Sequence, residues 1–216
     1  MEQIEASEAY EYSPLPHVHD RNLSFRIFTL HPADQFSAPI RGDLRTCSIP
    51  LSDTEHFVCE PYEALSYAWG DVTPTSTITF PDNSILPIAA NLNAFLRHRR
   101  HHEDTLDLWI DAICINQADN NERSSQVQIM GPIYFLASRL SIWLGPPSSD
   151  SALAISTLRE LSWESPYSKL SVTAEESTAI DRLLGRTWWY RVWIIQELAF
   201  GALGRKYLRT TVRCGL

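Results

Sequence analysis

The sequence predicts a single α/β domain, in which a mostly parallel sheet is flanked by helices and preceded by an N-terminal β-hairpin region. Three observations support this. After residue 90, apolar runs of strand length alternate with helical patterns, which is the rhythm of β-α-β units. Before it, short alternating segments are separated by turn residues. The chain of 216 residues, 44% of them hydrophobic, is also long enough for one real core.

The first half of the chain contains the hairpin region. Residues 1–22 are acidic and lack periodicity, so we expect a flexible lead-in. Three segments rich in β-forming residues then predict strands: "SFRIFTL" (24–30), "RTCSIPL" (45–51) and "YEALSYAWGD" (62–71). The pieces "TITF" and "ILPI" flank the turn sequence "PDNS" and predict a hairpin.

A helix and a buried strand are expected next. "ANLNAFLRHRRHH" (90–102) has Asn91 as a candidate N-cap and a cationic end suited to the C-terminal dipole of a helix. "TLDLWIDAICI" (105–115) reads as one buried strand. "NNERSSQVQIM" (120–130) opens the following helix, and Gly131-Pro132 is expected to interrupt or kink it.

The remaining elements are a strand and two helices. "LSIWLG" (140–145) predicts a buried strand, and "ALAISTLRELS" (152–162) predicts a helix. "RTWWYRVWIIQELAF" (186–200) also predicts a helix. The apolar residues at helical spacing in it are expected to pack on the sheet: Val192, Ile195, Leu198 and Ala199.

Composition excludes several functional classes. The formal charge of −8 argues against a nucleic-acid binder, which needs a basic surface. Neither a signal peptide nor an apolar run long enough to span a membrane is present, so a cytoplasmic protein is expected. The four cysteines are widely spaced and are expected to be reduced thiols. The histidines do not form a metal-site pattern, and the common phosphate-binding and hydrolase motifs are missing from the sequence.

The segment around Cys114 poses the question of a nucleophile. Cys114 has Asp111 and Asn116 close in sequence, but it stands between Ile113 and Ile115. An apolar environment raises a thiol pKa, so a buried, unreactive thiol is the preferred interpretation. Asn116 and Gln117 would instead point into the crevice at the carboxyl end of the strand, where open α/β sheets bind ligands.

Glu197 is the candidate for catalysis. It follows Trp193 by one helical turn among apolar neighbours, so its carboxylate needs a partner or a function. One interpretation is a structural ion pair with Arg191 or Arg186. The other is a functional carboxylate, and the residues alone leave both open.

Three blocks together resemble the fungal heterokaryon incompatibility (HET) domain: "YEALSYAWGD", "LWIDAICINQADNNERSSQVQIMGPIYFLASRLSIWLG" and "RTWWYRVWIIQELAF". The resemblance covers roughly residues 24–200, and Gly131-Pro132 departs from the family pattern. It implies a HET domain at residues 23–204, followed by a short tail at 205–216 that a truncated gene model or a stand-alone domain would explain. Such domains are associated with non-self recognition and regulated cell death, often in longer proteins with a partner-sensing region.

The HET domain is in turn similar to TIR domains, and this likeness implies a TIR-like (flavodoxin-like) fold. The glutamate in the corresponding helix of TIR enzymes is catalytic in cleaving NAD, and by position it maps to Glu197. NAD would be a substrate, and no metal or cofactor is implied. The residues expected to bind it are Ser66, Tyr67, Gly70, Asp71, Asp111, Asn116 and Trp193. A structural role for Asp111 is equally open.

Two functional hypotheses therefore stand. In the first, the chain is a death effector that hydrolyses NAD through Glu197. In the second, it is a non-catalytic signalling adaptor whose surfaces self-associate or recruit a partner protein, and the same motif residues form its core.

Overall fold

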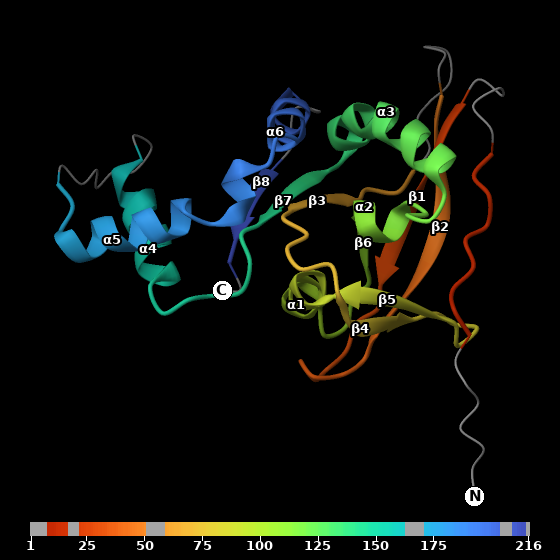
Figure 1. Cartoon of the computed structure of the whole chain (residues 1–216), viewed down its shortest axis with the longest axis horizontal. Coiled ribbons are helices and arrows are strands. Elements are labelled where there is room, and N and C mark those ends of the chain that lie inside the picture. The colour runs from red at the N-terminus through yellow and green to blue at the C-terminus, as the bar shows by residue number, and fades with distance from the viewer. Residues whose placement is uncertain (1–7, 17–21, 51–58, 163–170, 204–208, 215–216) are drawn as a thin grey trace, which may run out of the picture.

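Within its described residues, the chain forms a mixed eight-stranded sheet with helices on both faces (Figure 1). The computed structural model describes residues 8–16, 22–50, 59–162, 171–203 and 209–214. The strands are β1 (Asn22–Leu30), β2 (Ile40–Pro50), β3 (Glu63–Tyr67), β4 (Pro74–Thr79), β5 (Ile85–Ala89), β6 (Leu106–Trp109), β7 (Arg139–Trp143) and β8 (Arg209–Arg213). They lie in the order β5-β4-β2-β1-β6-β3-β7-β8.

The helices are α1 (Ala90–Arg99), α2 (Asp111–Cys114), α3 (Asn120–Leu136), α4 (Ser151–Leu161), α5 (Ala174–Leu184) and α6 (Ile194–Leu203), with a one-turn 3₁₀ helix at Thr187–Tyr190. Strands β6, β3, β7 and β8 are parallel neighbours, which confirms the predicted α/β class. The N-terminal strands extend the same sheet, because β1 pairs antiparallel with both β2 and β6. Strands β4 and β5 form the expected hairpin, with Asn83 at positive φ in its turn.

Helix α1 covers one face of the sheet, and α3 and α6 cover the other (Figure 1). Phe95 of α1 contacts Trp143 of β7 edge to face, with ring centroids 5.8 Å apart. On the opposite face Trp109 of β6 packs against Tyr134 of α3. The α4–α5 pair lies beyond the β8 side of the sheet, and a Thr173–Glu176 capping box begins α5.

Part of each predicted terminal segment joins the sheet. In residues 8–16, Tyr10 stacks on Phe80 of the β4–β5 turn, and the Tyr12 hydroxyl donates to the Ile113 carbonyl at 2.9 Å. Strand β8 falls in the segment assigned from sequence to a tail, and it pairs in parallel with β7.

One prediction about the middle of the chain is wrong, and of the interruption or kink expected at Gly131-Pro132 the interruption does not occur. The expected strand at 105–115 ends at Trp109, and one turn of helix, α2, follows, so Asp111, Ile113 and Ile115 do not alternate along a strand. An apolar run this short does not distinguish strand from helix by its pattern. Helix α3 also runs through Pro132 without ending, because Ile133 and Tyr134 are buried against the sheet.

Two further details of the helices differ from expectation. Asn91 is not an N-cap, because α1 begins at Ala90 and the Asn91 side chain instead bonds the Ala68 carbonyl and the Trp143 indole. The predicted helix at 186–200 is two helices, with Arg191–Trp193 between them. Its expected apolar stripe does not face the sheet, since Val192 is 80% and Ile195 70% exposed. The break rotates α6 so that Glu197 faces inward.

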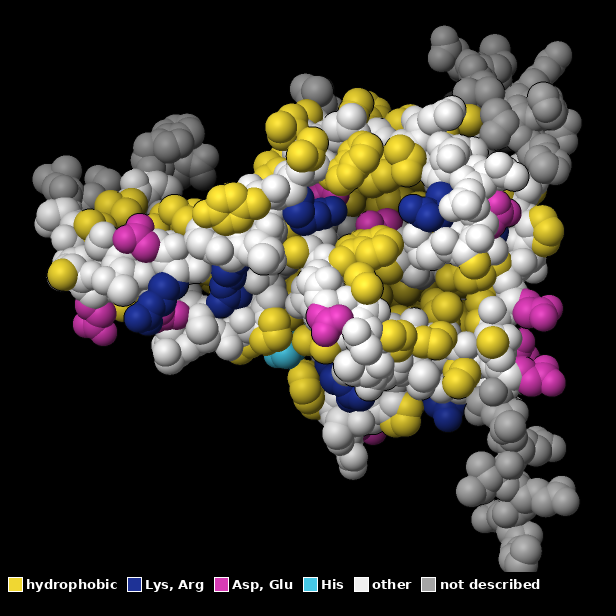
Figure 2. Space-filling view, viewed as in Figure 1, with side chains coloured by type: hydrophobic (Ala, Val, Ile, Leu, Met, Phe, Trp, Pro, Cys, Tyr) yellow, Lys and Arg dark blue, Asp and Glu magenta, His cyan; other side chains and the backbone are white. Residues whose placement is uncertain are grey.

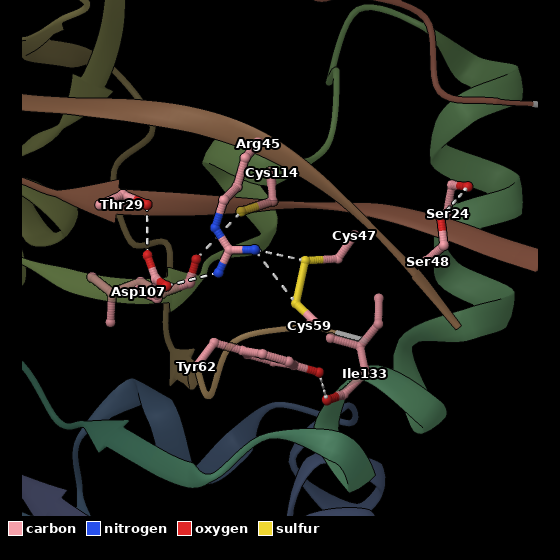
Figure 3. The surroundings of a disulfide bond; sticks show 11 residues. Ser24, Thr29, Arg45, Cys47, Ser48, Cys59, Tyr62, Asp107, Cys114 and Ile133 are labelled. Carbon is pink, nitrogen blue, oxygen red and sulfur yellow. Dashed lines mark hydrogen bonds and ion pairs between the residues drawn. A yellow bond between two sulfur atoms is a disulfide. The ribbon is translucent and has the colours of Figure 1, made fainter. Parts of the chain in front are cut away.

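The prediction of reduced thiols is wrong for Cys47 and Cys59, which form a disulfide with Cα atoms 5.8 Å apart (Figure 3). Cys47 lies on β2 and Cys59 shortly before β3, and these strands are not neighbours in the sheet. Their separation of 12 residues in the sequence does not indicate that the two side chains lie on the same face of the sheet. The Arg45 guanidinium lies against both sulfurs and pairs with Asp107 at 2.7 Å.

A buried ion pair fixes α1 against the sheet. Glu63 of β3 is 3% exposed, and its carboxylate accepts from Arg99 of α1 at 2.7–3.2 Å and from Ser141 of β7. Burial by itself would raise the pKa of Glu63, but the hydrogen bonds from Arg99 and Ser141 outweigh it and lower that pKa. Removal of either Glu63 or Arg99 would therefore leave the other charge buried without its main partner.

We expect Arg99→Met to lower the free energy of unfolding by about 3 kcal/mol, because it leaves the Glu63 carboxylate buried with its main partner removed. The double variant Glu63→Gln/Arg99→Met should recover part of that loss. Urea unfolding measures both. Arg159→Met, at an exposed position near the end of α4, is the control. A single variant as stable as this control would contradict the prediction.

Candidate functional site

The candidate site lies where the parallel strands β3 and β6 end side by side. The chain leaving β3 passes through Ala68 and Trp69 to Gly70, whose φ of +67° allows a turn that other residues rarely adopt. The chain leaving β6 enters α2 at Asp111. Carboxyl ends of neighbouring parallel strands are where open α/β sheets bind ligands.

Two adjoining cavities open at this point, and we call them together the tryptophan cleft. One has a volume of about 250 Å³ and the other about 460 Å³. Both are lined by Trp69, Asp111, Arg191 and Trp193. The smaller cavity adds Ile115, Gln117, Arg123, Val127 and Met130, and the larger adds Ala68, Gly70 and Thr187. Figure 2 shows hydrophobic side chains around a hollow that also exposes charged groups of both signs.

Glu197 lies behind the wall of this cleft and does not line it. Its side chain is 1% exposed. The carboxylate accepts from both terminal nitrogens of Arg191, at 3.0 and 3.2 Å, and from the Ser66 hydroxyl. Of the two interpretations of Glu197, the ion pair with Arg191 is the contact that the structure contains.

The segment before α6 supplies the rest of this network. Trp188, in the 3₁₀ helix, is buried and donates its indole N–H to the Ser66 hydroxyl at 2.8 Å. Ser66 therefore accepts from Trp188 and donates to Glu197. Arg191 follows in the break before α6, where it reaches back to Glu197 on one side and faces the cleft on the other.

Asp111 is the carboxylate that reaches the cleft. Its two oxygens accept from the Trp69 indole N–H at 3.0 Å and from the Ala112 backbone N–H at 2.8 Å. Burial raises the pKa of Asp111 to about 6, which the hydrogen bonds from Trp69 and Ala112 partly oppose. The nearby charges of Arg191 and Glu197 act on it in opposite directions.

The structure brings some of the predicted site residues together and separates others. Gly70, Asp111 and Trp193 line the cleft, and Ser66 and Glu197 lie behind it. Three predicted residues do not line the cleft, namely Tyr67, Asp71 and Asn116. Tyr67 is buried and lines a separate pocket beside α1, because successive strand residues face opposite sides of a sheet. Asp71 is exposed and accepts from the Thr73 backbone, and Asn116 accepts from the Ala118 backbone.

Sequence reasoning missed several residues that line the cleft. Trp69 belongs to the conspicuous "YEALSYAWGD" block but was not considered beside Gly70. Arg123 and Met130 lie on one face of α3, seven residues apart, and nothing in their spacing ties them to a cleft. Arg191 was weighed only as a partner for Glu197.

The remaining predictions concern Cys114, metals and membranes. Cys114 is fully buried, which confirms the buried thiol, and burial raises its pKa to about 12. Among the described residues, no group of three or more metal-ligating side chains is found. Of the helices that the structure describes, none has both the length and the apolarity to cross a membrane.

Fold and cleft together define a class: an α/β domain with a cleft at the strand ends, built from sequence blocks far apart in the chain. The model of the heterokaryon incompatibility protein (HET) family matches residues 62–197, and the chain belongs to this family. It is also 30% identical, over 92% of its length, to heterokaryon incompatibility protein 6, OR allele, of Neurospora crassa. The chain spans only 35% of that relative's length. No solved structure matches.

We expect Asp111→Asn to stabilise the protein increasingly as the pH rises. The pKa of Asp111 is about 6 in the folded state, and its usual value is 3.8. Below pH 3.8 Asp111 is therefore protonated in both the folded and the unfolded protein. Between these values the folded state keeps a proton that the unfolded state has lost, and stability falls as the pH rises. Urea unfolding at about pH 4 and about pH 7.5 should show the variant's advantage grow by about 1–3 kcal/mol. An advantage independent of pH would contradict this.

Proposed function

We propose that this chain is an effector domain of fungal non-self recognition and regulated cell death, and that its tryptophan cleft hydrolyses NAD. Membership of the HET family supports the role in incompatibility. The observation that carries the catalytic part is a buried carboxylate, Glu197, directly behind an arginine of an aromatic-walled cleft. Trp69 and Trp193 offer flat surfaces of the kind that a nicotinamide or adenine ring stacks on.

The proposed reaction breaks the bond between C1′ of the ribose and N1 of the nicotinamide. The electron pair leaves with N1, so nicotinamide departs as a neutral molecule and the ribose becomes an oxocarbenium-like cation. A fixed carboxylate stabilises that cation, and water then adds to C1′ with loss of a proton. The products are ADP-ribose and nicotinamide, and neither a metal nor a redox partner takes part.

Arg191 links substrate binding to Glu197 in this proposal. The arginine pairs with Glu197 and also lines both cavities of the cleft. Guanidinium groups bind phosphate oxygens well, so the diphosphate of NAD competes with Glu197 for Arg191. Movement of Arg191 toward the diphosphate uncovers the carboxylate on the side of the cleft. Meanwhile the Ser66 hydroxyl donates to the Glu197 carboxylate, and the Trp188 indole donates to that hydroxyl, so both groups stay in place.

The second candidate is a non-catalytic adaptor, and a different observation favours it. Around the 3₁₀ helix and the start of α6, Tyr190 is 77%, Val192 80% and Ile195 70% exposed. Exposed apolar groups of this kind are typical of protein contact surfaces. In the adaptor, the ion pair of Arg191 with Glu197 is purely structural and the surface near α6 binds a signalling partner or another copy.

Incubation with NAD tests the catalytic proposal. We expect the purified chain to release nicotinamide, and Glu197→Gln to lower the rate by about 100-fold or more, because the neutral amide no longer stabilises the cationic ribose. The assay is run at low and high protein concentration, since the resemblance to TIR enzymes implies that assembly promotes activity. Chromatography follows nicotinamide.

Two controls keep the result interpretable. Glu175→Gln, at an exposed position on α5, should leave the rate unchanged. Thermal unfolding shows whether Glu197→Gln remains folded, since Arg191 loses a charged partner. No nicotinamide from the folded wild type at either concentration rejects the enzyme. Cell death caused equally by wild type and Glu197→Gln in a fungal host selects the adaptor.

A further inference from the structure

Among the acidic side chains at this site, Asp111 reaches the cleft and Glu197 does not. Asp111 lines both cavities, whereas Glu197 is closed off by Arg191 and Ser66. No other Asp or Glu appears among the residues that line the two cavities, within the part of the chain that is described. Before Arg191 moves toward the diphosphate, a water molecule bound in the cleft therefore meets one carboxylate, that of Asp111.

The Asp111 carboxylate is oriented and still has room for a ligand. Oδ2 accepts a hydrogen bond from Trp69, and Oδ1 accepts one from the Ala112 backbone. A carboxylate oxygen has two lone-pair directions, so each oxygen can accept another hydrogen bond from the cleft side. Its backbone begins the one-turn helix α2, one residue after β6 ends. This combination of fixed position and spare acceptor capacity suits a general base.

We propose that Asp111 is the general base that takes a proton from the attacking water, an inference that rests on the proposed hydrolysis of NAD. Nicotinamide leaves as a neutral group and needs no acid, so proton removal from water is the step that remains for a side chain. The water oxygen forms the new bond to C1′, its proton passes to Asp111, and Asp111 later releases that proton to solvent.

The two carboxylates thereby have separate roles. Glu197, held by Ser66 and uncovered when Arg191 turns to the diphosphate, stabilises the positive charge on the ribose. Asp111 acts on the water and must be ionised to do so. Pairs of carboxylates with different surroundings and different roles are a general solution in the cleavage of glycosidic bonds.

The charged and titratable groups around Asp111 come from several elements. Tyr67 of β3 and Tyr134 of α3 interact with its charge, as do Cys114 on its own helix, Arg191 and Glu197. Arg123 of α3 lines the same small cavity. Burial raises the pKa values of both tyrosines and of the Cys114 thiol above their usual ranges, so these three groups stay neutral near pH 6.

The pH profile of the reaction follows from this environment. A base is active when deprotonated, so the rate of nicotinamide release should rise with pH. The pKa of Asp111, which burial raises to about 6, sets the midpoint of that rise. The hydrogen bond from Trp69 lowers this pKa. Trp69→Phe removes the bond but keeps an aromatic ring, and should move the midpoint to higher pH.

A purely structural role for Asp111 predicts something different. Asp111 could serve only to orient Trp69 and to begin α2, and its replacement would then lower the rate equally at every pH. The acidic limb of the pH profile is the range in which the rate falls as the pH decreases. Its position separates the two roles, because the limb reports the ionisation of the base and not the amount of folded protein.

The test measures nicotinamide release from NAD between about pH 5 and pH 8 for the wild type, Asp111→Asn, Asp111→Glu and Trp69→Phe. We expect Asp111→Asn to lose about 100-fold or more in rate and to lose the acidic limb. Asp111→Glu should keep part of the activity and should also keep the acidic limb of the pH profile. Asp104→Asn is the matched control, because Asp104 is exposed before β6, at the end of that strand remote from the cleft.

The outcomes separate this inference from the proposed function. If Asp111→Asn keeps the wild-type rate, or a lowered rate with the same limb, Asp111 is not the base although NAD hydrolysis stands. An unmoved limb in Trp69→Phe also overturns the assignment. If the folded wild type releases no nicotinamide at any pH, the proposed function fails and the role of Asp111 fails with it.

Discussion

The arrangement of the cleft depends on one buried interaction, the carboxylate of Glu197 held between Ser66 and Arg191. Ser66 belongs to β3, Glu197 to α6 and Arg191 to the break between the 3₁₀ helix and α6. The interaction therefore attaches the last third of the chain to the centre of the sheet. A carboxylate this buried costs several kcal/mol to desolvate, so it is maintained only where its partners are present and well placed. The wall of the cleft is fixed by the same contacts that satisfy the charge.

Much of the fold could be predicted from the sequence where one physical signal dominates. The alternating β-forming residues of β1, the turn before Ile85 and the apolar run of β7 each have a single reasonable interpretation. Prediction failed where tertiary contacts override local preference. Pro132 stays inside α3 because its neighbours are buried, and the α2 turn is held from outside by Tyr12 and Arg26, which donate to the carbonyls of Ile113 and Cys114.

The site was only partly predictable, for a different reason. Residues at strand ends were expected to converge, and this holds for Gly70 and Asp111, which follow neighbouring parallel strands. The alternation of side chains places Tyr67 on the other face, and that depends on register, which the sequence alone does not fix. The pairing of Glu197 with Arg191 depends on a break in a helix that periodicity predicted to be continuous. Contacts between helices have no comparable sequence signal.

Gly131 of α3 lies at the contact between α3 and α6. A methyl group at this position would lie 2.9 Å from the Phe200 ring of α6, so the bare glycine backbone allows the ring to rest directly on α3. Phe200 is three residues after Glu197 on the same helix. Gly131 follows Met130, which lines the smaller cavity, so this close contact between α3 and α6 lies beside the cleft. Because position 131 has no side chain, the Phe200 ring of α6 can rest on the backbone of α3, and a larger residue there would require the ring to move.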